Sequence, residues 1–227
     1  MGRPWPAPET LLPGGYRVDR ARLALESLSV ELFRVADPNA LANAVDPAAF
    51  AEDERFPYWA EVWPSGVALA TFVGRRDLSG RGVLELGCGV GLAGVAAALR
   101  GARVLFTDFD PDALAFAAAN HALNLGPPGA VRVLDWREPP AGLSAEVILA
   151  ADVLYERRFL TSFLDALRAL LAPAGVAYVA EPGRRIAEGT VERLEAEGFE
   201  RELHLEEVCV HGRAHAIWIH ELRRPAA

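Results

Sequence analysis

A glycine-rich loop is the feature of this chain that most restricts its fold. Residues 85–91 read Glu-Leu-Gly-Cys-Gly-Val-Gly and lie between a predicted strand, residues 83–86, and a predicted helix, residues 92–100. A sharp turn from strand to helix needs glycine for its backbone angles, and positions without side chains allow a ligand to lie against the chain. Residues 89–94 also fit the G-x-G-x-x-G pattern of dinucleotide sites. The loop therefore predicts a ligand site and leaves the kind of ligand open.

After this loop, short apolar segments with the character of strands alternate with segments of helical periodicity. Such alternation is typical of βαβ units and predicts a doubly wound α/β fold, with a parallel sheet covered on both faces by helices. Asp110 and Pro111 suit a helix start, and Gly101 and Gly126 suit helix ends. The predicted strands are residues 83–86, 103–107, 131–134, 147–151 and 176–180; the predicted helices are residues 92–100, 111–125, 159–171 and 186–197.

The two ends of the chain follow other patterns. Residues 199–210 and 215–222 predict two long strands in a C-terminal antiparallel hairpin. Residues 59–73 suit a helix in which Pro64 marks a kink or the start. Residues 1–55 are rich in proline, alanine and aspartate, and we interpret them as an N-terminal extension whose residues 28–33 form a strand or a hairpin arm. Residues 56–227 are expected to form the main domain.

Composition excludes several classes of protein. A net charge of -8 disfavours nucleic acid as a partner, because nucleic-acid binders need a basic surface. No apolar run reaches the roughly 18 residues of a membrane span, so we expect no membrane association. Two distant cysteines without CxxC spacing indicate neither disulfides nor zinc, which favours the reducing cytoplasm. The histidines of the predicted C-terminal hairpin lack the spacing of common metal sites, so we expect solvated side chains and no metal.

Acidic residues at the predicted strand ends narrow the choice of ligand. Glu85 precedes the first glycine, where a carboxylate could hold a cationic amino group, directly or through water; a pyrophosphate would gain nothing from it. Asp108 ends the next strand and suits both hydroxyls of a ribose. Asp135 and Trp136 follow the strand after that and offer an acceptor and an aromatic face to adenine. The alternative is that the glycines serve helix packing and that Asp135 and Trp136 are a solvated acid and a packing aromatic ring.

With these features the sequence resembles the class I methyltransferases, which have a mostly parallel, seven-stranded Rossmann-like sheet. Within that class it is similar to the protein-lysine methyltransferases related to the electron-transfer flavoprotein β-subunit methyltransferase. The resemblance covers residues 56–222. It rests on residues 57–66 (Pro-Tyr-Trp-Ala-Glu-Val-Trp-Pro-Ser-Gly), residues 85–91, Thr107-Asp108, Asp135-Trp136 and residues 151–155 (Ala-Asp-Val-Leu-Tyr), which match a D-x-x-Y motif. Residues 181–184, Glu-Pro-Gly-Arg, resemble the Asp-Pro-Gly-Arg of the flavoprotein methyltransferases but begin with glutamate, which leaves the subfamily open.

The resemblance implies S-adenosyl-L-methionine as the cofactor and assigns a role to each matching position. The methionine part would be held by Glu85, Gly87, Gly89 and Gly91, and the ribose by Asp108. Adenine contacts would come from Phe109, Asp135 and Trp136, with Trp63 and Ala151 beside the cofactor. Asp152 and Tyr155 would line the acceptor site as catalytic residues.

The expected reaction is methyl transfer to an amine nitrogen, most often a lysine of a protein. A carboxylate at Asp152 would raise the pKa of an acceptor ammonium, so it suits orientation better than deprotonation. A small-molecule amine remains an alternative acceptor, because Trp59, Asp152 and Tyr155 would also suit it. Asp152 as a helix cap and Tyr155 as a packing ring are the structural alternatives. A nucleotide-linked oxidoreductase and a non-catalytic cofactor-binding module are more remote.

Overall fold

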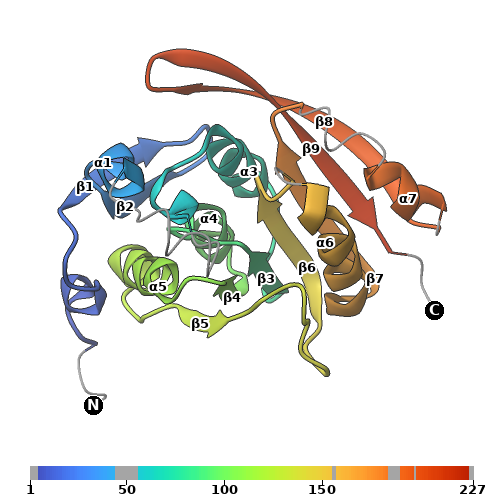
Figure 1. Cartoon of the computed structure of the whole chain (residues 1–227), viewed down its shortest axis with the longest axis horizontal. Coiled ribbons are helices and arrows are strands. Elements are labelled where there is room, and N and C mark those ends of the chain that lie inside the picture. Colours follow the sequence, from blue (N-terminus) through green and yellow to red (C-terminus); the bar gives the residue numbers. More distant parts are fainter. Residues whose placement is uncertain (1–4, 44–55, 155–156, 184–189, 197, 225–227) are drawn as a thin grey trace.

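A seven-stranded sheet forms the centre of the protein (Figure 1). The computed structural model describes residues 5–43, 56–154, 157–183, 190–196 and 198–224. Sheet order is β5-β4-β3-β6-β7-β9-β8; β3 to β7 pair in parallel, and β9 runs antiparallel to both of its neighbours. The strands are β3 (Gly82–Leu86), β4 (Arg103–Asp108), β5 (Ala130–Val133), β6 (Ala145–Ala151), β7 (Leu171–Glu181), β8 (Glu200–Val210) and β9 (Arg213–Arg223). The predicted doubly wound α/β fold with a C-terminal antiparallel hairpin is confirmed.

Helices cover both faces of this sheet. Because side chains alternate along a strand, Val83 packs in one apolar cluster and Leu84 in another. The first cluster includes residues of α3, α4 and α5, and the second includes residues of α6 and α7. The central strands are therefore buried on both sides, as their apolar sequences predict. The helices are α3 (Pro64–Gly74), α4 (Leu92–Leu99), α5 (Pro111–Leu125), α6 (Arg157–Leu170) and α7 (Thr190–Ala196).

Local signals fix several helix boundaries. Asp110 is the N-cap of α5, and its Oδ1 accepts a hydrogen bond of 2.8 Å from the main-chain N–H of Asp112. Pro64 is the first residue of α3. It therefore starts that helix and does not kink it, and residues Tyr58–Ala60 form a separate 3-10 helix, η2. The main chain of Trp59 in η2 lies close to the glycine loop at Gly89.

The sheet edges depart from the sequence prediction. Strand β5 was expected to be apolar and covered on both faces, but all four of its residues are exposed, with Val131 42% and Val133 56% accessible. Strand β5 lies at the end of the strand order, so only β4 pairs with it, and its contact with α5 leaves all four residues exposed. At the other edge, the expectation of solvated histidines is wrong for His220, which is 7% exposed beside Glu181.

The N-terminal extension contains a hairpin, as predicted. Strands β1 (Val18–Ala24) and β2 (Ser29–Val35) pair antiparallel, and β2 packs against α5. Around it lie the 3-10 helix η1 (Pro8–Leu11) and the short helix α1 (Pro38–Asn43). Among the described helices, none is long and apolar enough to cross a bilayer. The long β8–β9 hairpin extends past the helices toward this N-terminal part (Figure 1).

Candidate active site

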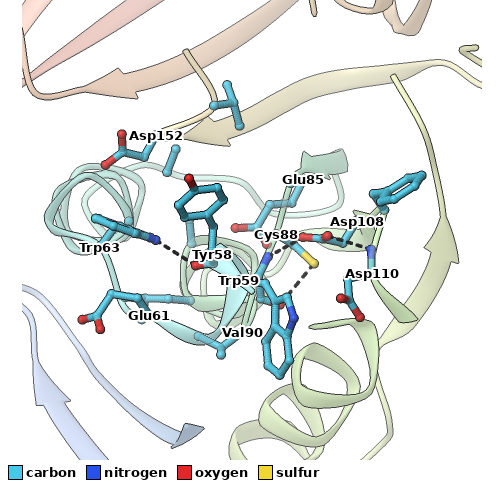
Figure 2. Close-up of a pocket in the computed structure, with 18 of the residues that line it drawn as sticks. Tyr58, Trp59, Glu61, Trp63, Glu85, Cys88, Val90, Asp108, Asp110 and Asp152 are labelled. Carbon is cyan, nitrogen blue, oxygen red and sulfur yellow. Dashed lines mark hydrogen bonds between the residues drawn. The ribbon is translucent and has the colours of Figure 1, made fainter. Parts of the chain in front are cut away.

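A pocket opens at the carboxyl ends of β3, β4 and β6, where ligands bind in open α/β sheets. Its volume is about 220 Å³. Figure 2 shows the glycine-loop side of this pocket beside the segment that precedes α3. Ten of the residues expected at the site line it: Trp63, Glu85, Gly87, Gly89, Asp108, Phe109, Asp135, Trp136, Ala151 and Asp152. Tyr155 lies outside the described residues.

The glycine loop adopts left-handed backbone angles that favour glycine. Gly89 has φ of 50°, and a Cβ atom there would lie 3.1 Å from the carbonyl oxygen of Trp59. Gly91 has φ of 81° and is the N-cap of α4, but it does not line the pocket. A Cβ at Gly91 would lie 2.9 Å from that of Ala117 in α5. Gly91 therefore serves the close approach of two helices, whereas Gly89 lies at the pocket wall.

Asp108 is held firmly at the pocket edge. Its Oδ2 accepts from the main-chain N–H of Gly89 at 2.9 Å, and its Oδ1 accepts from the N–H of Asp110 at 3.0 Å. Burial raises the pKa of this carboxyl to about 6, against the opposing effect of the two main-chain donors. The carboxylate is thus largely ionised at neutral pH. Its position is fixed by the end of β4, to which Asp108 belongs, and by hydrogen bonds from Gly89 in the loop and Asp110 at the start of α5.

Glu85 is more deeply buried than Asp108. It is 4% exposed, and its Oε2 accepts from the main-chain N–H of Gly94 at 3.0 Å. Gly94 is needed beside it, because a Cβ there would lie 2.4 Å from that same oxygen. Burial raises the pKa of Glu85 to about 8, and no arginine pairs with it among the described residues. A cation arriving in the pocket would therefore meet a buried acid that lacks a counter-charge.

From the sequence, the Asp135 carboxylate was expected to accept a hydrogen bond from adenine. In the structure this carboxylate already accepts from Arg137. Arg137 binds Asp135 through two Nε contacts of 2.8 and 2.9 Å, and this bond lowers the pKa of the Asp135 carboxyl. The same guanidinium lies 5.6 Å from the ring centre of Phe109. Trp136 packs against Gly87, where a Cβ would be 3.2 Å from its ring. These side chains form one wall of the pocket.

The opposite wall comes from Asp152 and the aromatic segment before α3. Asp152 has a positive φ of 58°, its N–H donates to Ala180 O at 2.9 Å, and its Oδ2 accepts from Ser65 Oγ at 3.2 Å. Trp63 is fixed by an indole N–H bond of 2.9 Å to the carbonyl oxygen of Tyr58. In Figure 2, Trp63 and Asp152 lie on the same side of the pocket, across from Asp108. A carboxylate bordered by rings suits a cationic amine.

Several lining residues were not singled out as site residues from the sequence. Those with aromatic or charged side chains include Phe56, Tyr58, Glu61, Arg137 and Phe159. These residues do not lie at strand ends; they come from the segment before α3, from the loop after β5 and from α6. The signal available for residues 56–61 was the density of aromatic side chains just before a helix start.

A cluster of two glutamates and a histidine lies on the β8–β9 hairpin. Ligand atoms of Glu202, His204 and Glu221 lie within 4.8 Å of one another on the β8–β9 hairpin. Glu221 is already paired with Arg223, and Arg76 lies 3.7 Å from its other oxygen. Because these guanidinium groups neutralise the buried carboxylate, the cluster is accounted for as an ion-pair network.

The comparison with protein families decides the identity of this site. The family model described as lysine methyltransferase matches residues 48–193, which is more than half of the chain. This chain belongs to the lysine methyltransferase family. The matched stretch contains the glycine loop, every described site residue named above and α6.

Curated relatives of this lysine methyltransferase family member are named as lysine or arginine methyltransferases. Protein N-lysine methyltransferase METTL21A of Danio rerio is 41% identical over 122 residues, covering 49% of this chain and 55% of that protein. EEF1A lysine methyltransferase 3 of Mus musculus is 34% identical over 157 residues, covering 63% and 65%. Histone-arginine methyltransferase METTL23 of Homo sapiens is 37% identical over 103 residues, covering 42% and 54%. The chain thus spans about half to two thirds of the length of these relatives.

Solved structures confirm the fold. The N-methyltransferase NodS of Bradyrhizobium japonicum, in complex with S-adenosyl-L-homocysteine, matches with a TM-score of 0.59 and 17% identity, over 83% of this chain and 97% of that one. Magnesium protoporphyrin IX methyltransferase of Synechocystis with bound SAM matches with a TM-score of 0.55 and 18% identity, over 84% and 98%. At this identity the likeness establishes the methyltransferase fold.

Proposed function

We propose that this protein transfers a methyl group from S-adenosyl-L-methionine to the side-chain amine of a lysine in a protein substrate. The observation that carries the proposal is the convergence of Glu85, Asp108 and Asp152, from three neighbouring strand ends, on one pocket beside the glycine loop. Membership of the lysine methyltransferase family and the names of the relatives support lysine as the acceptor.

The residues present fit this cofactor. Bound S-adenosyl-L-methionine supplies an electrophilic methyl group on a sulfonium centre. Asp108 offers two anchored carboxylate oxygens that suit ribose hydroxyls. Glu85 is a buried acid without a basic partner among the described side chains, and the ammonium of an amino acid would supply the missing charge. Gly89 keeps the wall free of side chains where the ligand passes.

On the acceptor side, Asp152 would attract and orient the substrate ammonium. Its carboxylate favours the charged amine, so loss of the proton from a lysine with a reference pKa of about 10.4 has to come from desolvation in the pocket. Trp63 and Tyr58 provide the apolar walls that exclude water, and positioning of the amine in line with the transferred group carries most of the rate. Tyr155, which matches the D-x-x-Y motif, is proposed to act with Asp152.

A lysate experiment tests the proposal. The protein is incubated with cell extract and cofactor labelled in the methyl group, and label is measured separately in macromolecules and small molecules. Acid hydrolysis of labelled protein should then give methyl-lysine. Label in methyl-arginine would favour the chemistry named for METTL23, and label in small molecules would favour a small-amine substrate.

Two remote alternatives have simple tests as well. A nucleotide-linked oxidoreductase would be stabilised against heat by NAD and not by S-adenosyl-L-homocysteine. A non-catalytic cofactor-binding module would bind S-adenosyl-L-homocysteine but label nothing. The proposal also places the protein in the cytoplasm, which suits its two free thiols, Cys88 and Cys209.

A further inference from the structure

A second cavity shares a wall with the candidate active site. It is lined by Arg34 to Asn39, by residues 60–62 and by His211, and its volume is about 430 Å³. Glu61 and Val62 line both cavities. In Figure 2 the Glu61 carboxylate points away from Asp152 and from the glycine loop. A substrate that extends outward from the acceptor side of the first pocket would therefore enter the second cavity directly beyond Glu61.

This second cavity is built by three parts of the chain that are distant in sequence. Arg34 belongs to strand β2, and Asp37 to the turn before α1; Glu61 follows η2, and His211 forms the tip of the β8–β9 hairpin. The hairpin reaches the other parts through His211, whose Nε2 lies 3.5 Å from Glu61 Oε1. Figure 1 shows why this is possible, because β8 and β9 extend well beyond the end of the central strands.

The parts that enclose this cavity differ in their relation to the family. Glu61 lies within the segment that matches the lysine methyltransferase model, residues 48–193, whereas Arg34, Asp37 and His211 lie outside it. The matched segment holds the groups proposed for cofactor and acceptor nitrogen. Side chains contributed from outside that segment, placed next to the acceptor side, are suited to distinguish one substrate from another.

The cavity is polar and offers both signs of charge. Glu61 is 29% exposed at its side chain, and its nearby partner His211 is 66% exposed, so a stronger cation has access to the Glu61 carboxylate. On the other wall, Arg34 Nε is buried and has no hydrogen-bond partner among the described residues. Because this Nε is closed to solvent, a ligand in the cavity would meet the terminal nitrogens of the Arg34 guanidinium, which are hydrogen-bond donors.

From these observations we infer that the second cavity is a subsite for the acceptor polypeptide, in which Glu61 pairs with a basic residue close to the methylated lysine and Arg34 donates to the substrate main chain. The inference rests on the proposed function and deepens it, because it names a basic-flanked polypeptide as the substrate class. A small amine would occupy the first pocket and leave Glu61 with His211 as its neighbour and Arg34 without a substrate acceptor.

Charge reversal at Glu61 tests the inference. Wild type, Glu61→Arg and the control Glu200→Arg are given the same cell extract at several dilutions with methyl-labelled cofactor. Glu200 is exposed at the start of β8, at the end of that strand opposite the hairpin tip. Glu200→Arg therefore makes the same change in net charge as Glu61→Arg, but far from the second cavity. Like charges brought together at a recognition site oppose binding strongly. At limiting extract we expect protein labelling by Glu61→Arg to be about tenfold slower than by wild type, with a smaller difference at high extract, as for a raised KM.

Two further measurements complete the test. Calorimetry with S-adenosyl-L-homocysteine should give wild-type affinity for Glu61→Arg, which separates substrate recognition from cofactor binding. Arg34 lines the second cavity but not the first. Arg34→Ala should also raise the KM for protein, by a few fold. Equal labelling of protein by wild type, Glu61→Arg and Arg34→Ala would overturn the inference and leave the proposed function standing. Label in small molecules alone, or nowhere, would overturn both.

Discussion

The side-chain amide of Asn120 donates a hydrogen bond of 2.9 Å to the carbonyl oxygen of Val90 in the glycine loop. The same side chain, fully buried in α5, accepts from the N–H of Phe33 at 2.6 Å and donates to the carbonyl of Phe33 at 3.0 Å. One residue thus ties the N-terminal hairpin to the loop that lines the candidate cofactor site. The hairpin thus supports the site mechanically, although it lies outside the family match.

Removing this amide should affect both stability and cofactor binding. Asn120→Ala leaves buried groups of Phe33 and Val90 without partners, each costing about 1–3 kcal/mol, so we expect a loss of about 3 kcal/mol or more in the free energy of unfolding. Affinity for S-adenosyl-L-homocysteine should fall as the loop loosens. Asn124→Ala is the matched control, because Asn124 bonds β2 at Glu31 and does not touch the loop. Denaturant unfolding and calorimetry measure the two effects, and equal cofactor affinity in both variants would refute the link.

Cofactor affinity should depend on pH through Asp108. Its folded pKa of about 6 lies above the ordinary value of 3.8, so the carboxylate becomes protonated as the pH falls through about 6 and can no longer accept from two hydroxyls. We expect affinity for S-adenosyl-L-homocysteine to decline between pH 7 and pH 5. In Asp108→Asn the affinity should be lower by roughly 10- to 100-fold at pH 7, and this acidic decline should disappear. A decline of the same size in the variant would assign it to another group.

Glu85→Gln should make the ligand-free protein more stable and the cofactor complex weaker. The folded pKa of about 8 exceeds the ordinary 4.5, so between these values the unfolded state has released a proton that the folded state keeps. The free energy of unfolding of the wild type therefore falls as the pH rises through this range. Glutamine preserves an acceptor for Gly94 and removes the titration. Urea unfolding at pH 5 and pH 8 should show a smaller pH effect in the variant, while its affinity for S-adenosyl-L-homocysteine drops roughly tenfold or more through loss of the charge.

Two glycines with left-handed backbone angles and different surroundings offer a test of packing. Gly91→Ala places a methyl group 2.9 Å from Ala117 Cβ at a φ of 81°, whereas Gly126→Ala, at a φ of 97°, meets nothing within 4 Å. Both variants pay about 1 kcal/mol or more for the left-handed angle, and Gly91→Ala adds overpacking of about 1–3 kcal/mol. Thermal unfolding should rank Gly91→Ala well below Gly126→Ala. Equal melting temperatures would show that α4 and α5 separate easily.

Much of the central fold could be predicted because local signals and burial agree there. The α5 boundaries follow from Asp110 and Gly126, and the core strands are apolar because both faces are covered. The exposure of Val131 and Val133 could not be predicted, since an apolar edge strand has the same sequence pattern as a central one. The burial of His220 depends on the pairing of β9 with β7, which joins residues far apart in sequence.

The candidate site was predictable where it follows strand ends. Asp108 is the last residue of β4 and Asp152 directly follows β6, and parallel strands bring their carboxyl ends to one edge. The pairing of Asp135 with Arg137 was missed because a neighbouring cation in a loop has no periodic signature. Glu61 and Arg34 were missed for a different reason: they line one cavity together with His211 at the tip of the C-terminal hairpin, and these three residues are far apart in sequence.

Methyl transfer to an amine held by Asp152 can be tested by measuring cofactor binding and methyl transfer in the same two proteins. Wild type and Asp152→Asn are compared for binding of S-adenosyl-L-homocysteine by calorimetry and for transfer of label from S-adenosyl-L-methionine to proteins of a cell extract. We expect equal affinity for S-adenosyl-L-homocysteine in the two proteins and methyl-lysine in the hydrolysate of wild-type reactions. Labelling by Asp152→Asn should fall at least tenfold, because the amine loses its charged partner. Wild-type labelling of protein by Asp152→Asn, or no labelled methyl-lysine with either enzyme, would contradict it.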